Sequence, residues 1–277
     1  MSKEADAISL AQAGRRLPYP EGEDEIAELG RTLNAMLDRI EAAFARERMF
    51  LDDASHELRT PIAVLRAELE VALLESGDRE ALERSLRSAL EEAQRLAHLA
   101  EDLLVLARAS AGRLPLRRRP VEVRTLVEEA VRRNANGAAG RNGLQLRVDG
   151  PGARAVVDPA RLEQVVANLV GNARRFARGE VRVQVRPDGD DVVIVVADDG
   201  PGFPATVLPV AFDRFTRAEA ARSHDAGAGA GLGLAIVAAI VRAHGGTISA
   251  GNGPPLGGAA VVVRLPLDET GPVPEPV

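Results

Sequence analysis

The stretch FLDDASHELRTP, residues 50–61, lies inside a run of apolar residues spaced by seven. The run is Leu37, Phe44, Leu51, Leu58, Leu65 and Ala72, with companions at Leu33, Ile40, Ala54, Ile62 and Leu69. This spacing predicts a long helix with one apolar seam. At about 100° per residue, His56 lies roughly 140° from Leu51 and 160° from Leu58, so it points away from the seam. The geometry excludes a buried core histidine and leaves an ordinary surface histidine as the alternative to a functional one.

A second apolar seam follows a break at residues 76–78, with sequence Ser-Gly-Asp. It consists of Leu82, Leu86, Ala89, Ala93, Leu96, Ala100, Leu103 and Ala107. Two seamed helices joined by a short turn predict a helical hairpin. A single hairpin buries too little of both seams, so we expect two copies to pair as a dimeric four-helix bundle. One hairpin packed on its own second domain is the alternative.

Residues 120–268 alternate between strand-like and helix-like runs separated by glycines. We expect helices at 121–131, from an N-cap at Asp158 to Phe176, and at 231–244. We expect strands at 144–148, 154–157, 181–185, 192–197, 247–250 and 259–265. Helices beside a mixed sheet predict an α+β sandwich, so the chain is expected to be multidomain.

Composition excludes several classes of protein. The net charge of −6 argues against nucleic acid as a partner, and the absence of cysteine excludes disulfides and cysteine metal sites. No run of 18 apolar residues exists, so this stretch is not expected to span a membrane. Lys3 is the only lysine, which excludes both a P-loop and the strand lysine of protein kinases.

The neighbours of His56 favour a function for it. Asp52 and Thr60 lie four residues on either side and share its helix face, Glu57 follows directly, and Pro61 removes a backbone donor. The stretch SHELRTP resembles the phosphoacceptor box of the sensor histidine kinases, of the type H-E-x-x-[TN]-P. The resemblance implies that His56 accepts the γ-phosphoryl group of ATP and that Glu57 holds the other ring N–H. It also implies that Thr60 orients a water molecule for dephosphorylation of the regulator.

Three further stretches resemble the nucleotide-binding boxes of the same family. In RLEQVVANLVGNARRF, residues 161–176, Asn168 and Asn172 share one helix face, although two polar surface residues would look the same. The resemblance implies that Asn172 binds Mg²⁺ and that Asn168 and Arg175 contact phosphates. Phe176 stands where the family more often has tyrosine.

The second box is VVADDGPGFP, residues 195–204, which fits the family pattern as Asp198, Gly200 and Gly202; an acidic turn is the simpler reading. By resemblance, Asp198 accepts a hydrogen bond from the adenine amino group. The third is GAGAGLGLAIV, residues 227–237, where Gly229, Gly231, Leu232 and Gly233 lead into a helix whose first N–H groups can bind phosphate. Arg217, in a segment that resembles the family's mobile lid, is a candidate phosphate contact.

The resemblance implies a dimerisation and phosphotransfer hairpin followed by the Bergerat ATP-binding sandwich of gyrase-, Hsp90- and MutL-type ATPases. The expected domains are a partial HAMP-like signal-relay helix (1–45), the hairpin (46–112), the ATP-binding domain (113–268) and a disordered tail (269–277). The implied partners are Mg-ATP, a second copy and the receiver domain of a response regulator, with a membrane segment upstream of a cytoplasmic region. His98, His224 and His244 match no motif and are read as ordinary residues.

Two other functions remain open from the residues. One is an ATPase of the gyrase or Hsp90 kind that acts as a conformational machine; the exposed histidine argues against it. The other is a scaffold with an inactive nucleotide site. The stimulus, the cognate regulator, and whether the phosphoryl group crosses between protomers cannot be read from the residues.

Overall fold

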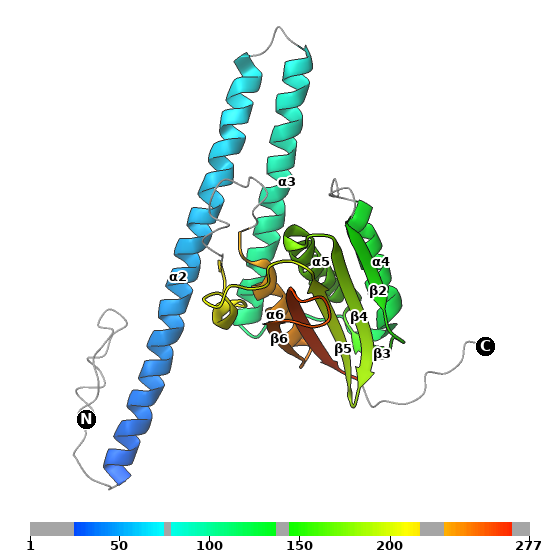
Figure 1. Ribbon diagram of the computed structural model, residues 1–277. Helices are drawn as coiled ribbons and strands as arrows, with labels where there is room; N and C mark the ends of the chain where they lie inside the picture. The colour runs from blue at the N-terminus through cyan, green and yellow to red at the C-terminus, as the bar shows by residue number, and fades with distance from the viewer. Residues whose placement is uncertain (1–24, 75–78, 137–143, 217–229, 268–277) are drawn as a thin grey trace, which may run out of the picture. The chain divides into compact units, whose positions relative to one another are not determined.

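The computed structural model describes residues 25–74, 79–136, 144–216 and 230–267. The chain forms two compact units, Met1–Ala89 and Leu90–Val277. Helices α2 (Glu25–Leu74) and α3 (Arg79–Ser110) are the two long helices in Figure 1, and α3 continues from the first unit into the second. Pro61 lies inside α2, which continues past it. Arg217 of the expected lid, Gly229 of the third nucleotide box, the expected turn at 76–78 and the tail lie outside these residues.

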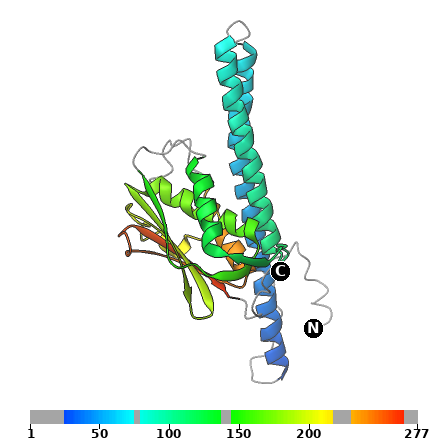
Figure 2. The same ribbon diagram turned by 90° about the vertical axis from the view of Figure 1, so that its right-hand side faces the viewer.

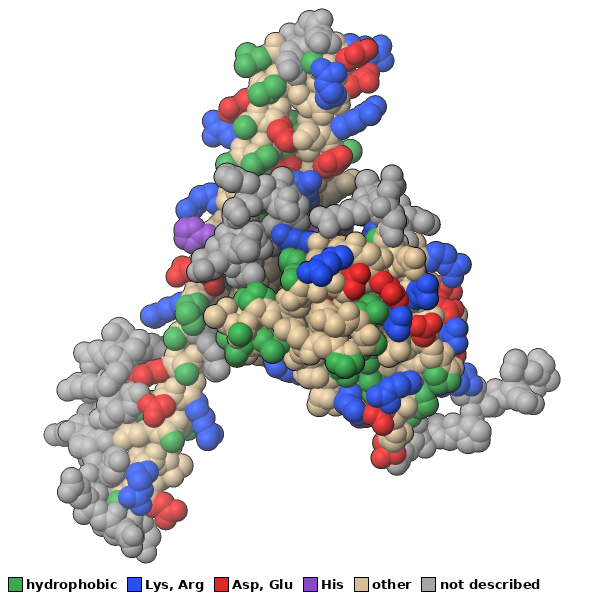
Figure 3. All heavy atoms as spheres, in the orientation of Figure 1, with side chains coloured by type: hydrophobic (Ala, Val, Ile, Leu, Met, Phe, Trp, Pro, Cys, Tyr) green, Lys and Arg blue, Asp and Glu red, His purple; other side chains and the backbone are tan. Residues whose placement is uncertain are grey.

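The stripe that α2 buries differs from the predicted seam. Phe50, Ala54 and Ala72 are buried, whereas Leu51, Ile62 and Leu69 are 56%, 53% and 43% exposed. Figure 3 shows hydrophobic side chains at the surface along the helices. The prediction of a single apolar seam was therefore too simple. The apolar residues of α2 form two stripes, of which one is buried within the chain and the other is exposed.

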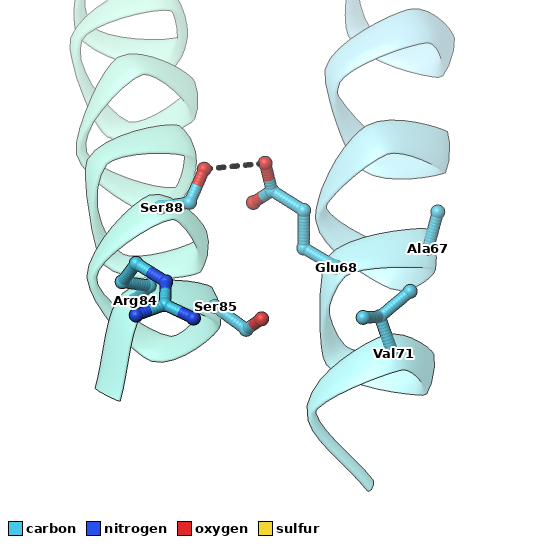
Figure 4. A pocket seen from close by; sticks show the side chains of 6 residues that line it. All are labelled: Ala67, Glu68, Val71, Arg84, Ser85 and Ser88. Atoms are coloured by element: carbon cyan, nitrogen blue, oxygen red, sulfur yellow. Dashed lines mark hydrogen bonds between the residues drawn. The ribbon is translucent and has the colours of Figure 1, made fainter. Parts of the chain in front are cut away.

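A polar pair joins the two helices near the turn end of the hairpin. Ser88 Oγ donates to Glu68 Oε1 at 2.6 Å, above a hollow lined by Ala67, Glu68, Val71, Arg84, Ser85 and Ser88 (Figure 4). Glu68 follows His56 by twelve residues, which is about 18 Å along a helix. The hollow is therefore separate from the surroundings of His56.

The second unit contains a five-stranded sheet in the order β2-β4-β5-β7-β6. Its strands are β2 (Gln145–Asp149), β4 (Glu180–Asp188), β5 (Asp191–Asp198), β6 (Thr247–Asn252) and β7 (Ala259–Pro266). β2 pairs parallel with β4, and the other pairs are antiparallel. Alternate valines of β4 and β5 face the same side of the sheet, because Val183 pairs with Val196 and Val185 with Ile194.

Helices α4 (Val123–Asn136), α5 (Pro159–Phe176) and α6 (Gly233–Ala243) cover one face of this sheet (Figure 2). α5 packs against both of the other helices and buries Leu162, Val165, Val166, Leu169 and Val170. Full burial of such a side chain contributes about 1.5–3 kcal/mol relative to exposure. The α/β sandwich expected from the sequence is confirmed.

Two details differ from the expectation. Residues 121 and 122, which were expected to start a helix, instead complete β1 (Arg119–Glu122). Their backbone pairs antiparallel with β3 (Arg154–Val157), so they take an extended conformation. α6 starts at Gly233 rather than at residue 231, where Gly231 has a φ of +72° that a helix cannot contain. No helix among the described segments is long and apolar enough to cross a membrane.

Candidate functional site

His56 lies on the exposed side of α2. Its neighbours Ala54 and Leu58 are buried and half-buried, so the backbone is held while the imidazole faces outward. Within the described chain no hydrogen bond joins His56 to Glu57, which is half-buried, or to the exposed Thr60. An imidazole in this position can be approached by a large group.

Helix α5 carries the two asparagines of the first nucleotide box. It begins with Asp158 as N-cap, whose carboxylate accepts from the Arg161 N–H at 3.2 Å, and Pro159 occupies its first turn as predicted. Asn168 and Asn172 are half-buried. The Nδ2 of Asn168 is buried and lacks a hydrogen-bond partner within the described residues. A buried donor is costly to leave unpaired, so this N–H group is suited to donate to a ligand acceptor.

The side chain of Asn168 lies beside the third nucleotide box. A Cβ atom at Gly233 would lie 3.6 Å from Asn168 Oδ1. Asn168 therefore meets the first residue of α6, where backbone N–H groups lack helical partners and can bind an anion. The arrangement places the Asn168 amide group beside a helix N-terminus.

Asp198 ends strand β5 and is 3% exposed. Its Oδ1 accepts the N–H groups of Gly200 at 2.8 Å and Ala259 at 3.2 Å. The described hydrogen bonds of the carboxylate all end on Oδ1, which leaves Oδ2 for a ligand donor. Burial raises the pKa of Asp198, although the two N–H groups act to lower it.

Glycine is required at positions 200 and 202, because neighbouring atoms leave no room for a Cβ atom. A Cβ atom at Gly200 would lie 2.5 Å from the Phe176 carbonyl oxygen, so the loop after Asp198 touches the end of α5. A Cβ atom at Gly202, whose φ is +80°, would lie 2.7 Å from Asn252 Oδ1. These two contacts set the course of the loop between Asp198 and Phe203.

Asn252 was not singled out by the sequence. Its Oδ1 accepts from the Phe203 N–H at 2.7 Å and its Nδ2 donates to the Phe203 carbonyl at 2.8 Å. The side chain therefore clamps the loop that follows Asp198 from the end of β6. No motif marks this residue, because the contact joins positions 49 apart.

The next residue, Asp199, has a structural role. Its carboxylate accepts the N–H groups of Arg178 at 2.7 Å and Gly179 at 2.9 Å, just after α5 ends. Burial would raise the pKa of Asp199, but backbone N–H donors outweigh it and hold the pKa below its ordinary value. Of the two adjacent carboxylates, one fastens the loop after α5 and the other faces the site.

The remaining predicted residues have contacts of their own. A Cβ atom at Gly231 would lie 2.9 Å from the Thr216 carbonyl oxygen, so the third box meets the end of the preceding described segment. Leu232 is buried. The Arg175 guanidinium lies 5.3 Å from the centre of the Phe176 ring, within range of a cation–π contact. The structure thus brings Asn168 to Gly233, and Gly200 to the end of α5 at Phe176.

These groups fit a nucleotide. An amide donor and a helix N-terminus suit phosphate oxygens, and a buried carboxylate suits an amino donor. The described part of the chain contains no group of three His, Cys, Asp or Glu that could hold a metal. Mg²⁺ commonly takes one or two protein oxygens together with phosphate oxygens, so the Asn172 amide oxygen is a suitable ligand.

Three family models match the chain. They are the "Histidine kinase-, DNA gyrase B-, and HSP90-like ATPase" (residues 157–269), the "His Kinase A (phospho-acceptor) domain" (46–112) and the "HAMP domain" (1–42). A probable sensor histidine kinase, TcrY of Mycobacterium tuberculosis, is 42% identical over 91% of this chain and 54% of its own. The chain belongs to the two-component sensor histidine kinases.

Other kinases agree. The kinase AfsQ2 of Streptomyces coelicolor is 37% identical over 92% of this chain and 49% of its own. Among solved structures, the Acinetobacter baumannii histidine kinase AdeS matches with a TM-score of 0.61 and 26% identity, over 77% of this chain and 98% of that one. The chain spans about half the length of TcrY and AfsQ2. The ATPase model supports ATP as the nucleotide, and the phosphoacceptor match does not favour a conformational machine.

Proposed function

We propose that the chain transfers the γ-phosphoryl group of ATP to His56 and then to an aspartate of a response regulator. The observation that carries the proposal is an exposed imidazole in SHELRTP, on a chain whose second unit holds the Asn168 amide beside a helix N-terminus; the Nδ2 of this amide is buried and has no partner within the described residues. The first group can act as a nucleophile, and the second can bind phosphate.

The residues supply positioning and charge stabilisation, which dominate phosphoryl transfer. Asn168 and the N–H groups at the start of α6 hold phosphate oxygens, Asp198 accepts from the adenine amino group, and Arg175 adds positive charge. Mg²⁺, when bound through Asn172, neutralises phosphate charge. Arg217 of the lid and Gly229 of the third box, which both lie outside the described residues, are further candidates for contacts with phosphate.

In the transfer step, the lone pair of a neutral imidazole nitrogen of His56 forms a bond to the γ-phosphorus. The bond from this phosphorus to the β–γ bridging oxygen breaks, and ADP leaves with the electron pair. The other ring nitrogen then releases its proton, and Glu57, the next residue, is the carboxylate that holds this N–H. Thr60, one turn further on the same face, orients water when the phosphorylated regulator is hydrolysed.

The test is incubation with γ-labelled ATP and Mg²⁺. Wild type is expected to gain a label that is stable in base and lost in acid, as for phosphohistidine, and His56→Gln is expected to gain none. His98→Gln, an exposed histidine on α3, is the matched control and should label like wild type. A label that persists in His56→Gln would place the acceptor elsewhere.

We also propose a homodimer through the hairpin. Leu51, Ile62 and Leu69 lie within roughly 20° of one another around α2 and form an exposed apolar stripe. On α3, Leu86 is likewise 48% exposed. A second hairpin that covers these stripes with its own would complete a four-helix bundle.

Ile62→Glu with Leu69→Glu is expected to halve the molar mass measured by light scattering, because each charge would be buried in the interface. Val64→Glu is the matched control: Val64 is 42% exposed but lies about 160° around the helix from Ile62. Equal masses for the two variants would show that the stripe is not the interface.

The remaining assignments follow from the family. The proposed boundaries are 1–45 for the HAMP-like relay, 46–112 for the hairpin, 113–268 for the ATP-binding domain and 269–277 for the tail. The partner is a receiver domain, and the natural protein is a membrane protein whose cytoplasmic part includes this chain.

A further inference from the structure

His244, which matches no motif, is one of four buried polar or charged residues among those described, and is 4% exposed. It caps the C-terminal end of α6. Its Nε2 accepts a hydrogen bond from the Asp158 N–H at 3.0 Å, and its Nδ1 lies 2.9 Å from the Ile240 carbonyl oxygen. Because Nε2 faces a donor, it carries no proton, so the ring is neutral and Nδ1 donates to the carbonyl. The ring joins the end of α6 to the start of α5.

Asp158 brings a third segment to the same point. Its Oδ1 accepts from the Arg161 N–H, and its Oδ2 accepts from the Arg117 N–H at 2.8 Å. The Arg118 guanidinium donates to the Ala243 carbonyl at 2.8 Å. Arg117 and Arg118 belong to the connector between α3 and β1. The connector, the start of α5 and the end of α6 therefore meet at one buried junction.

The residues proposed to bind the nucleotide lie further along the same two helices, in the middle of α5 and at the start of α6. Asn168 lies ten residues along α5 from Asp158, or about 15 Å, and Gly233 lies eleven residues along α6 from His244, or about 17 Å. Because Asn168 meets Gly233 while Asp158 meets His244, the helices run antiparallel and contact each other at two separate points. A sliding movement at the junction would be carried by the two rigid helices to the site.

We propose that His244 is a positioning residue for nucleotide binding, which sets the register of α5 against α6 through the Asp158 N–H and links that register to the connector. The proposal rests on the proposed function, because it assumes that Asn168 and the start of α6 bind ATP together. Burial lowers the pKa of His244, with the nearby Arg118 acting in the same direction and Asp158 against it. The neutral ring that accepts from Asp158 is thereby maintained.

The test compares two amide replacements at one position. The Oε1 of His244→Gln reaches the place of Nε2 and can accept from the Asp158 N–H, whereas the shorter His244→Asn reaches only the place of Nδ1. Each full-length variant is titrated calorimetrically with a non-hydrolysable ATP analogue and Mg²⁺, after circular dichroism has confirmed folding. Arg242→Gln, an exposed residue in the last turn of α6, is the matched control.

His244→Asn is expected to weaken nucleotide binding about tenfold, since a buried N–H loses its acceptor. His244→Gln is expected to remain within roughly threefold of wild type, because the hydrogen bond is restored. The labelling rate at saturating ATP should change much less than the affinity, because the reacting groups are untouched. Arg118→Ala, which removes the connector's contact with Ala243 and leaves the core intact, should weaken binding by a smaller factor.

Equal affinity of the Gln and Asn variants would overturn the inference, as it would mean that the hydrogen bond does not set the site. If neither variant folds, unchanged affinity in Arg118→Ala would overturn the link to the connector, and weakened affinity would support it. Failure of wild type itself to bind the analogue would instead overturn the proposed function.

Discussion

The hairpin and the ATP-binding unit hold their functional residues in opposite ways. On α2, large apolar side chains such as Leu51 and Ile62 are more than half exposed, and His56 has no hydrogen bond among the described residues. In the second unit, valines such as Val183 and Val192 are fully buried, and Asp198 is fixed by two backbone N–H groups. The functional residue of the hairpin is exposed and free to contact a partner, whereas the residues of the ATP-binding unit are held in place by contacts within that unit.

This difference predicts how substitutions act. A change at His56 should alter the reaction and leave unfolding unaffected, because the imidazole makes no contact that folding requires. A change in the ATP-binding unit can affect both, because the same side chains hold the loops and the ligand.

The largest effect is expected at the asparagines of α5. Asn172→Ala should reduce phosphorylation by about 100-fold or more, because the metal loses its protein oxygen. Asn168→Ala should weaken ATP binding without loss of thermal stability, since its Nδ2 has no hydrogen-bond partner within the described segments. Labelling with γ-labelled ATP and thermal unfolding would be measured on both. Full activity in Asn172→Ala would refute the metal assignment, and a lower melting temperature in Asn168→Ala would show that its amide has a structural role.

Smaller effects are expected at the two adjacent carboxylates, on ATP affinity for Asp198 and on melting temperature for Asp199. Asp198→Asn keeps an oxygen for Gly200 and Ala259 but removes a buried charge, so ATP affinity should fall roughly tenfold while the unliganded melting temperature stays or rises. Asp199→Asn should keep ATP affinity and lower the melting temperature by about 2–4 °C. Since the pKa of Asp199 is lowered, its contribution is present at neutral pH and is lost as pH falls through that pKa. The same phenotype in both variants would show that the two carboxylates are not divided between site and fold.

Local sequence patterns predicted the elements that depend on local periodicity. The alternating valines of β4 and β5 and the cap at Asp158 indicated strands and a helix that the structure contains. The family boxes likewise indicated Asn168 and Gly233, which the structure places beside each other. These features depend on spacing along the chain, which is visible in the residues.

The rest depends on which surfaces meet. The seam of α2 was predicted as one stripe because Leu51 and Ala54 are both apolar, and which of them is buried depends on tertiary contacts. Asp198 and Asp199 cannot be told apart by residue type, because their roles depend on donors from Ala259 and Arg178. Asn252 and His244 act on residues 49 and 86 positions away. Contacts over such distances leave no local signal.

The smallest effect concerns α3, the helix that passes from one unit to the other. Asp102, in the second unit, has a pKa raised to about 6 by burial, against the opposing effects of His98 and of the Gln164 amide, which donates at 3.4 Å. Because the ordinary pKa is about 3.9, the folded state holds the proton better, so stability is greatest in acid and falls as pH rises through about 6.

Asp102→Asn should therefore melt about 1–3 °C above wild type at pH 7.5, with the difference shrinking as pH falls and vanishing below about pH 4. Glu101→Gln, its exposed neighbour, is the control and should show no such pH dependence. Melting curves across this pH range decide the matter, because only a carboxylate enclosed on folding can produce the trend. Identical curves for Asp102→Asn and wild type would mean that α3 and α5 do not enclose Asp102 in solution. The packed part of the second unit would then begin after α3, and the whole of α3 would resemble the exposed hairpin.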